Sequence, residues 1–448
     1  MFSMLRLYRE NMGKLYRALG KFAARGYYNM VHAPSPFVPG ESPVPVSGKH
    51  WGAEEMESLT DAALDFWLTA GRFNDAFESE FARVVGRKHA LSVNSGSSAN
   101  LVAVAALCSP KLGERRLKPG DEVITVAAGF PTTVAPIVRQ GLVPVFVDMS
   151  PPTYNALPEQ IELAVSSKTR AIFLAHTLGN PFDVAEVLRV ARKHELWVIE
   201  DSCDALGSRY QVPEENAPRM CGSFGHIATY SFYPAHHITM GEGGAVVCDD
   251  PALYRIALSL RDWGRDCWCA PGRDDSCKKR YQWKFPLLPE GYDHKYVYSH
   301  LGYNLKITDM QAAVGLRQLE RLEAFTSARQ ENFRQLHAAL EDLDGDRLIL
   351  PQPTPGSLPS WFGFLISLKP EINRRAFLEY LNSKKIGTRL LFAGNITRQP
   401  CFEGVQYRSL GDLPGTDAIM HQTFWVGCYP GLGEEHMQYI AESIRKYF

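Results

Sequence analysis

The sequence predicts an α/β fold in which a large domain with a mainly parallel sheet is followed by a smaller α+β domain. Four short apolar runs have the length of buried strands: 121–126, 143–147, 171–175 and 196–199. Helical patterns separate several of these runs, and such alternation is typical of the crossover units that build parallel sheets. A long, nearly unbroken helical pattern at 310–343 then leads into shorter elements, as expected of a helix that links two domains.

The first fifty residues predict a separate N-terminal segment. Residues 1–30 carry six Lys or Arg and one acid among scattered apolar side chains. This pattern favours a basic amphipathic surface helix over a transit peptide, because it lacks the apolar stretch of a signal peptide. Residues 31–50 are rich in Pro, Ser and Gly, which indicates an extended arm.

The large domain is expected at 51–330 and the small domain at 331–448. Further elements predicted for the large domain are helices at 54–66, 75–85, 99–107 and 186–194 and strands at 90–93, 228–232 and 244–248. In the small domain we expect a strand at 361–368 and helices at 374–383 and 434–448. The apolar periodicity of each segment decides between strand and helix.

The composition is that of an ordinary enzyme. Apolar residues make up 45% of the 448 residues and charged residues 22%, and the formal net charge is −1. Nothing global therefore points to nucleic acid or to a membrane surface, and no apolar run is long enough for a spanning helix. Nine Cys is an odd and modest number, which argues against a disulfide scaffold and favours a reducing, cytoplasmic setting.

Two segments at predicted strand ends are candidate ligand sites. The turn that contains Gly96 and Ser97 joins a strand to a helix, and helix N-termini bind phosphate, although such turns often only cap helices. Asp201 ends an apolar strand, where an open parallel sheet binds its ligands. Its carboxylate could pair with a pyridine nitrogen, or simply cap a helix. Phe130 also follows a strand, where a core position is the plainer interpretation.

Residues 231–244 resemble the cofactor loop of the DegT/StrS family of vitamin B6-dependent sugar aminotransferases. In most of that family a Lys stands where this sequence has His236, and the Lys amine holds pyridoxal phosphate as a Schiff base. An imidazole cannot form that bond. A chain that keeps the loop and loses the amine should therefore keep the cofactor and change the reaction, and the loop is similar to that of the rarer hexulose 3-dehydrases.

The resemblance implies a type I aminotransferase fold with a seven-stranded sheet, and it implies a role for each candidate. Phosphate contacts are expected from Gly96, Ser97 and Ser231, a ring stack from Phe130 and the pyridine-nitrogen partner from Asp201. Asn304 matches a residue that the family presents to the partner subunit's phosphate, so a homodimer is expected. His236 is the expected base, because neutral imidazole titrates near pH 6.5. Tyr233 and Asp204 depart from the aminotransferase pattern together with it.

Three cysteines with the spacing C-x-C-x7-C form a second candidate site on a polar loop at 262–282. These are Cys267, Cys269 and Cys277, and Cys203 is the best candidate for a fourth ligand. The spacing differs from that of ferredoxins, so by spacing alone zinc fits at least as well. The resemblance favours iron, because the reductive 3-dehydrases carry a [2Fe–2S] cluster on this loop and on a Cys at the position of Cys203.

The expected function is removal of the C3 hydroxyl from a nucleotide-linked 4-keto-6-deoxyhexose, in 3,6-dideoxyhexose or related deoxysugar biosynthesis for lipopolysaccharide O-antigen. The resemblance implies CDP-4-keto-6-deoxy-D-glucose as substrate, an imine between pyridoxamine phosphate and the sugar, and one-electron reduction through the cluster. It also implies a separate flavin and iron–sulfur reductase as electron donor. The alternatives are a dTDP-4-keto-deoxyhexose 3-dehydratase and a sugar aminotransferase with a structural zinc.

Overall fold

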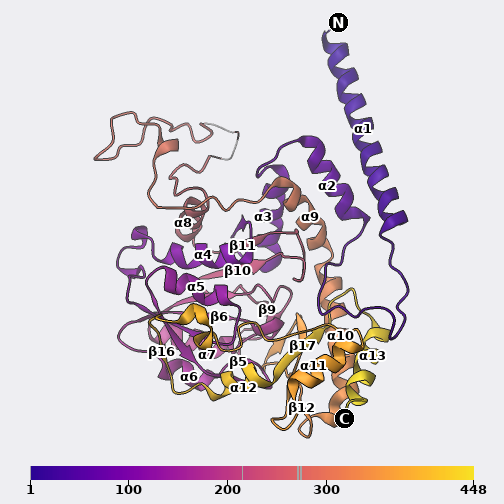
Figure 1. Cartoon of the computed structure of the whole chain (residues 1–448). Helices are drawn as coiled ribbons and strands as arrows, with labels where there is room; N and C mark the ends of the chain where they lie inside the picture. The colour runs from indigo at the N-terminus through magenta and orange to yellow at the C-terminus, as the bar shows by residue number, and fades with distance from the viewer. Residues whose placement is uncertain (1, 214, 270–271, 273–274) are drawn as a thin grey trace.

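The computed structural model describes residues 2–213, 215–269, 272 and 275–448 (Figure 1). The predicted N-terminal helix is α1 (Phe2–Val31), which projects from the body and packs beside α2 (Ala53–Asp65). Arg17 of α1 pairs with Asp61 and Asp65 of α2. Within the described residues, no helix combines the length and the apolar character that a bilayer-spanning segment requires.

The large sheet is mainly parallel, as predicted, but the described part of the chain builds it from eight strands. Its order is β1-β11-β10-β7-β6-β2-β3-β16. The strands are β1 (His89–Val93), β2 (Glu122–Val126), β3 (Val143–Val147), β6 (Thr169–Ala175), β7 (Trp197–Asp201), β10 (Ile227–Ser231), β11 (Gly244–Cys248) and β16 (Arg408–Ser409). Only β11 runs antiparallel to its two neighbours. The eighth strand is β16, which returns from the C-terminal part of the chain and pairs with β3.

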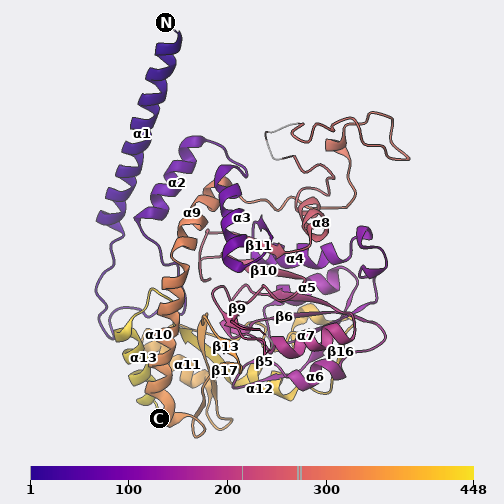
Figure 2. The same cartoon turned by 180° about the vertical axis from the view of Figure 1, so that it is seen from behind.

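Helices cover both faces of this sheet (Figures 1 and 2). They are α3 (Arg72–Val85), α4 (Gly96–Leu107), α5 (Pro131–Arg139), α6 (Pro158–Leu163), α7 (Val184–Lys193) and α8 (Pro251–Arg261). Neighbouring strand residues belong to different apolar clusters: Val123 packs with residues of α4 and α8, and Ile124 packs with residues of α7. Strands buried on both faces explain why the sequence shows continuous apolar runs here.

The predicted single helix at 310–343 is wrong. The chain forms α9 (Asp309–Glu320) and α10 (Leu322–Leu340), which meet at Arg321. There φ is −100° and ψ is 0°, and the Arg321 N–H bonds to the carbonyl of Gln318, three residues back. The guanidinium of Arg321 pairs with Glu55 of α2. Apolar side chains keep their spacing across the break, so the pattern could not reveal it.

A second, four-stranded sheet lies in the C-terminal part. Its strands, in order, are β12 (Leu348–Ile349), β14 (Gly363–Leu368), β17 (Thr423–Gly427) and β15 (Thr388–Arg389). Helices α10, α11 (Arg374–Ser383), α12 (Pro414–Gln422) and α13 (Glu434–Arg445) accompany it. The N-terminal arm joins this part, because Val44 forms a bridge with Ile386 and lies in its core. The division into 1–50, 51–330 and 331–448 stays a prediction. The arm packs in the C-terminal part, and β16 of the C-terminal part pairs in the large sheet, so segments of each part contribute to another.

Within the described residues, five short strands lie outside these two sheets. A hairpin is formed by β4 (Met149–Ser150) and β5 (Asn155–Ala156), and a three-stranded sheet by β13 (Ser357–Leu358), β8 (Arg209–Tyr210) and β9 (Arg219–Met220).

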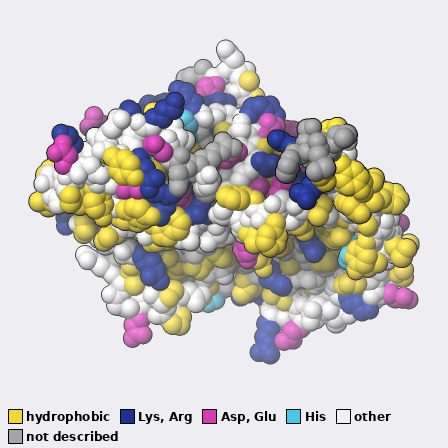
Figure 3. Space-filling model, turned by 90° about the horizontal axis from the view of Figure 1, so that it is seen from above, with side chains coloured by type: hydrophobic (Ala, Val, Ile, Leu, Met, Phe, Trp, Pro, Cys, Tyr) yellow, Lys and Arg dark blue, Asp and Glu magenta, His cyan; other side chains and the backbone are white. Residues whose placement is uncertain are grey.

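On the outside, the side chains of Leu15, Leu19 and Phe22 of α1 are at least half exposed. Figure 3 shows hydrophobic side chains gathered over much of the face seen from above.

Candidate active site

A cavity of about 750 Å³ opens at the carboxyl ends of the parallel strands. Its walls include nine residues that the sequence singles out: Gly96, Ser97, Phe130, Asp201, Cys203, Asp204, Ser231, Tyr233 and His236. Phe362, Arg389, Phe392 and Trp425 of the C-terminal part close another side. Asn304 lies elsewhere, where its side chain accepts a hydrogen bond from Lys306. The roles of these residues stay predictions, but tertiary folding gathers nine of them around one cavity.

Asp201 is 4% exposed and its carboxylate is held by neutral donors. One oxygen accepts from the Asn100 amide at 2.8 Å and the Thr133 hydroxyl at 2.7 Å, and the other accepts from the Cys203 N–H at 3.1 Å. A buried carboxylate without a cationic partner is costly. A protonated pyridine nitrogen in the cavity would supply that partner, so the site fits a vitamin B6 cofactor. Asn100 and Thr133 could not be predicted as partners of Asp201, because each lies far from it in the chain.

The N-terminus of α4 forms another part of the cavity wall. Ser95 caps this helix by accepting the Ser98 N–H, and Gly96 and Ser97 follow at its first turn. A Cβ atom on Gly96 would lie 2.5 Å from the Ser231 Cβ and 2.8 Å from the Cys203 sulfur. Glycine is therefore required for the close approach of helix and strand, and the free N–H groups of a helix start fit a phosphate.

His236 follows β10, and its imidazole packs on the ring of Phe362 with 5.2 Å between the ring centroids. Its Nδ1 lies 3.4 Å from Oδ1 of Asp204, and both side chains are 15% exposed. Burial raises the pKa of Asp204, although contact with His236 opposes that shift. A carboxyl group beside Nδ1 favours a proton on that nitrogen, which leaves Nε2 free to act as a base.

Two aromatic side chains present open surface to the cavity. Tyr233 is 52% exposed and Phe130 is 51% exposed. The rings of Phe130 and Phe392 pack in a T-shaped arrangement, with 5.5 Å between their centroids. No lysine is among the described residues that line the cavity. The cavity therefore offers aromatic surface for a cofactor ring and an imidazole where an amine would be needed for a covalent attachment.

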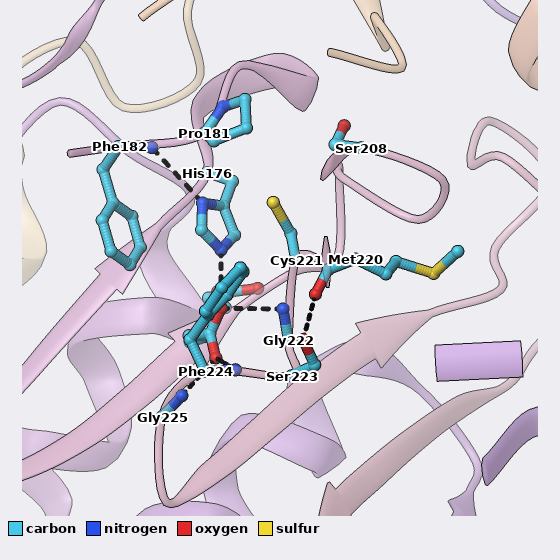
Figure 4. A network of polar contacts seen from close by, with 12 residues as sticks. His176, Pro181, Phe182, Ser208, Met220, Cys221, Gly222, Ser223, Phe224 and Gly225 are labelled. Atoms are coloured by element: carbon cyan, nitrogen blue, oxygen red, sulfur yellow. Dashed lines mark hydrogen bonds and ion pairs between the residues drawn. The ribbon is translucent and has the colours of Figure 1, made fainter. Parts of the chain in front are cut away.

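A buried polar network, which the sequence did not reveal, adjoins this cavity at His176 and is drawn in Figure 4. His176 follows β6 and accepts the Phe182 N–H at Nδ1, so its proton is on Nε2, which lies 3.2 Å from Glu200. The Glu200 carboxylate also accepts the backbone N–H groups of Gly222 and Phe224. Because Glu200 directly precedes Asp201 in β7, this network fixes the strand end that carries Asp201.

The cysteine loop leaves the body after α8 (Figure 1), and its residues 270, 271, 273 and 274 lie outside the described residues. Potential ligand atoms of Cys267, Cys269 and His294 lie within 4.8 Å of one another. The Cys277 sulfur lies 3.4 Å from Nε2 of His294. Burial would raise the pKa of Cys269, but hydrogen bonds with Ser276 and the two other thiols outweigh it and lower that pKa to about 7. The loop therefore presents thiols suited to a metal.

His294 is a candidate ligand that the sequence analysis missed. Its Nδ1 lies 3.0 Å from the carbonyl of Arg280 and so carries the proton, which leaves the Nε2 lone pair facing the sulfurs. Metal-binding histidines commonly show this arrangement. Cys203, the predicted fourth ligand, belongs to the cofactor cavity and is outside that group. Burial raises the pKa of its thiol well above the ordinary range. The four-cysteine set stays a prediction.

Comparison with known proteins places the chain among sugar-modifying enzymes. It is 57% identical over 424 residues to lipopolysaccharide biosynthesis protein RfbH of Salmonella typhimurium. The matched residues make up 94% of this chain and 95% of that protein. It is 52% identical over 427 residues to a dTDP-4-dehydro-2,6-dideoxy-D-glucose 3-dehydratase of Saccharopolyspora spinosa, which covers 95% and 90% of the two chains.

Solved structures agree with the predicted fold. The E. coli GDP-4-keto-6-deoxy-D-mannose-3-dehydratase with bound hydrated PLP matches with a TM-score of 0.78 and 28% identity, over 90% of this chain and 99% of that one. The aminotransferase-type α/β fold is thereby confirmed. The model of the DegT/DnrJ/EryC1/StrS aminotransferase family matches residues 49–445. Because that match spans most of the sequence, the chain belongs to the DegT/DnrJ/EryC1/StrS aminotransferase family.

Proposed function

We propose that the protein is a nucleotide-sugar 3-dehydratase that removes the C3 hydroxyl of a 4-keto-6-deoxyhexose with pyridoxamine phosphate. The observation that carries this proposal is His236, an imidazole instead of an amine, in a cavity that otherwise fits the cofactor. Names of the relatives support the reaction class, since those from Saccharopolyspora spinosa and E. coli are 3-dehydratases.

The side chains around the cavity divide the work of holding the cofactor. Asp201 would bind the protonated pyridine nitrogen, Phe130 would pack on the ring, and Gly96, Ser97 and Ser231 would bind the phosphate. When bound, pyridoxamine phosphate supplies an amine for the sugar ketone and a ring that accepts electrons. Without a lysine bond, retention of the cofactor depends on these non-covalent contacts.

His236 performs the proton step in this proposal. Its Nε2 would take a proton from the C4′ carbon of the cofactor, while Asp204 beside Nδ1 steadies the ring. Tyr233, half exposed on the same loop, is placed to contact the sugar. General-base catalysis of this kind contributes roughly 10²–10⁴-fold to the rate.

The expected substrate is CDP-4-keto-6-deoxy-D-glucose, with a dTDP-linked sugar as the alternative. Purified protein with pyridoxamine phosphate, a reductant and an electron-transfer reductase should release the C3 hydroxyl as water from the preferred sugar nucleotide. His236→Asn is the matched inactive control. If the unchanged protein instead forms an amino sugar with glutamate, and contains zinc, it is the alternative aminotransferase and the proposal is wrong.

We further infer that Cys267, Cys269 and Cys277 hold a [2Fe–2S] cluster that passes electrons from a reductase. The gathered thiols support a metal centre, and for its fourth ligand Cys203 is the sequence prediction and His294 the addition from the structure. Iron and acid-labile sulfide should be lost in Cys267→Ser and kept in the control Cys401→Ser, an exposed thiol. If iron is lost in Cys203→Ser but kept in His294→Ala, Cys203 is the fourth ligand. If iron is kept in Cys203→Ser but lost in His294→Ala, the fourth ligand is His294.

A homodimer is part of the same proposal, with Asn304 directed to the phosphate of the partner subunit. The exposed apolar side chains of α1 and of the segment after α8, such as Leu287 and Leu301, support an interface. Light scattering should give twice the 50.2 kDa chain mass. A monomer with full activity would contradict this part of the proposal.

A further inference from the structure

The large cavity carries acids and very little positive charge. Asp201, Asp204 and Glu242 lie in its lining, whereas Arg389 is the single Lys or Arg among the described residues that form it. The proposed reaction brings two anionic groups into this space, the phosphate of the cofactor and the diphosphate of the nucleotide-linked sugar. The N-terminus of α4 fits the first. A diphosphate near carboxylates needs a cation, and Arg389 is the group that can supply it.

Contacts on both sides hold the backbone at Arg389 in place. Arg389 ends β15, and the N–H of Gly387, just before this strand, donates to the carbonyl of Val44 in the N-terminal arm at 2.8 Å. Just after the strand, the carbonyl of Leu390 accepts from the indole Nε1–H of Trp425 at 3.2 Å. Trp425 also lines the cavity. The arm and β17 therefore fix the point from which the Arg389 side chain starts.

The guanidinium of Arg389 keeps most of its donors for a ligand. The residue is exposed, and its Nη1 donates to the carbonyl of Thr388 at 2.9 Å. Arg398 of the same part of the chain pairs with Asp417, but no carboxylate of the described chain forms an ion pair with Arg389. Its Nε–H and Nη2–H groups form a planar fork, which can donate to two phosphate oxygens at once.

We propose that Arg389 binds the diphosphate of the nucleotide-linked sugar and thereby directs the sugar toward His236. This inference deepens the proposed function and rests on it, because it takes the same substrate class. With the diphosphate held at an exposed residue, the sugar extends into the cavity that Tyr233 and His236 line. The nucleoside then lies toward the outside, beside Leu390, which is 45% exposed. Because CDP- and dTDP-linked sugars share the diphosphate, Arg389 selects the class of substrate and not the base.

Two other roles of an exposed arginine lead to different expectations. A guanidinium also binds carboxylates, so in an aminotransferase Arg389 would bind an amino-acid donor such as L-glutamate. An arginine that is only solvated, as most surface arginines are, would bind neither ligand. Separate titrations with sugar nucleotides and with L-glutamate therefore distinguish the three roles.

Binding without turnover tests the proposal. CDP-glucose and dTDP-glucose carry the diphosphate but lack the C4 ketone, so the amine of the cofactor cannot condense with them. In calorimetry on the full-length protein loaded with pyridoxamine phosphate, Arg389→Gln should weaken each sugar nucleotide that the unchanged protein binds by about 10–100-fold, as expected for the loss of a charge-assisted hydrogen bond. Arg192→Gln is the matched control, since Arg192 is exposed on α7 and outside the cavity lining.

A second variant and a kinetic measurement separate this role from a general change of the site. Arg389→Lys should recover part of the lost affinity, because it keeps the charge without the fork. In turnover, Arg389→Gln should raise KM by a similar factor and leave kcat nearly unchanged, because the diphosphate does not react. Titration of the cofactor should give the same affinity in all of these proteins.

The outcomes that would overturn the proposal are distinct. Equal affinity of Arg389→Gln and Arg192→Gln for the sugar nucleotides would do so, and so would a loss of L-glutamate binding with sugar-nucleotide binding unchanged. If the unchanged protein binds neither sugar nucleotide, both this proposal and the proposed function are wrong. If it binds them through Arg389 but does not dehydrate the 4-keto sugar, only the proposed reaction is wrong.

Discussion

At the scale of single residues, the character of the site depends on the side chain at position 236. The imidazole of His236 lies between Asp204, which is 3.4 Å from Nδ1, and the ring of Phe362. It shares the cavity with Asp201, whose carboxylate accepts hydrogen bonds from the neutral donors of Asn100, Thr133 and Cys203. Because these two functions belong to separate residues, proton transfer and cofactor binding should be separable by mutation.

His236→Asn should therefore bind the cofactor nearly normally and lose turnover by roughly 10²–10⁴-fold, the contribution of a general base. Cofactor binding is measured by fluorescence titration and turnover by loss of the sugar nucleotide. His194→Asn, on the surface beside Glu162, is the control. A turnover equal to that of the unchanged protein would mean that another group is the base.

His236→Lys should allow a covalent bond between the new amine and pyridoxal phosphate. Borohydride should then fix the cofactor at position 236, detectable by mass spectrometry of the digested protein, while dehydration falls. The unchanged protein is the control and should give no fixed adduct there. If no adduct forms in the variant either, the loop does not face the cofactor.

At the scale of elements, the contact between α4, β10 and the segment after β7 defines the phosphate end of the cavity. Gly96 starts α4, Ser231 ends β10 and Cys203 follows β7. They meet so closely that a methyl group on Gly96 would overlap both neighbours. The cysteine loop, by contrast, is a separate element with its own group of potential ligands, and Cys203 is the predicted ligand that it would share with the cavity.

Gly96→Ala should weaken cofactor binding by about 10–100-fold, because overpacking of this size costs about 1–3 kcal/mol and shifts the phosphate end. Iron content should stay unchanged if the loop alone holds the metal. Gly13→Ala, in the open on α1, is the matched control. Equal affinity in both variants would show that the first turn of α4 is not the phosphate site.

At the scale of the whole molecule, the buried carboxylate of Glu200 ties the centre of the large sheet to the loop at 222–225. Burial raises the pKa of Glu200, but hydrogen bonding to His176, the charge of Arg87 and backbone N–H groups outweigh it, so the pKa is lowered from 4.5. A lowered pKa means that the folded protein prefers the ionised form. The stabilisation is therefore complete above the ordinary pKa and is lost as the pH falls through the lower, folded value.

Glu200→Gln should reduce the free energy of unfolding at pH 7 by about 3 kcal/mol, because the amide leaves several buried donors poorly paired. The difference from the unchanged protein should shrink as the pH falls below 4.5, the ordinary pKa of the group. Urea unfolding of both proteins, at pH 7 and at a pH below 4.5, measures the two free-energy differences. Glu331→Gln, on the surface of α10 in an exposed pair with Arg334, should show a much smaller change. If the difference in unfolding free energy did not change with pH, the carboxylate charge would not be its cause.

The sequence by itself determined the α/β class, most of the elements that it predicted to within a few residues, and the positions after strand ends that line the cavity, because apolar periodicity and loop chemistry are local. Only the tertiary structure decided what comes together from distant segments. Asn100, Thr133 and His176 meet Asp201 or its neighbour through the sheet, and His294 joins the cysteines across a long loop. The break at Arg321 and the return of β16 have the same cause. Such contacts depend on packing between elements, which leaves no periodic trace in the chain.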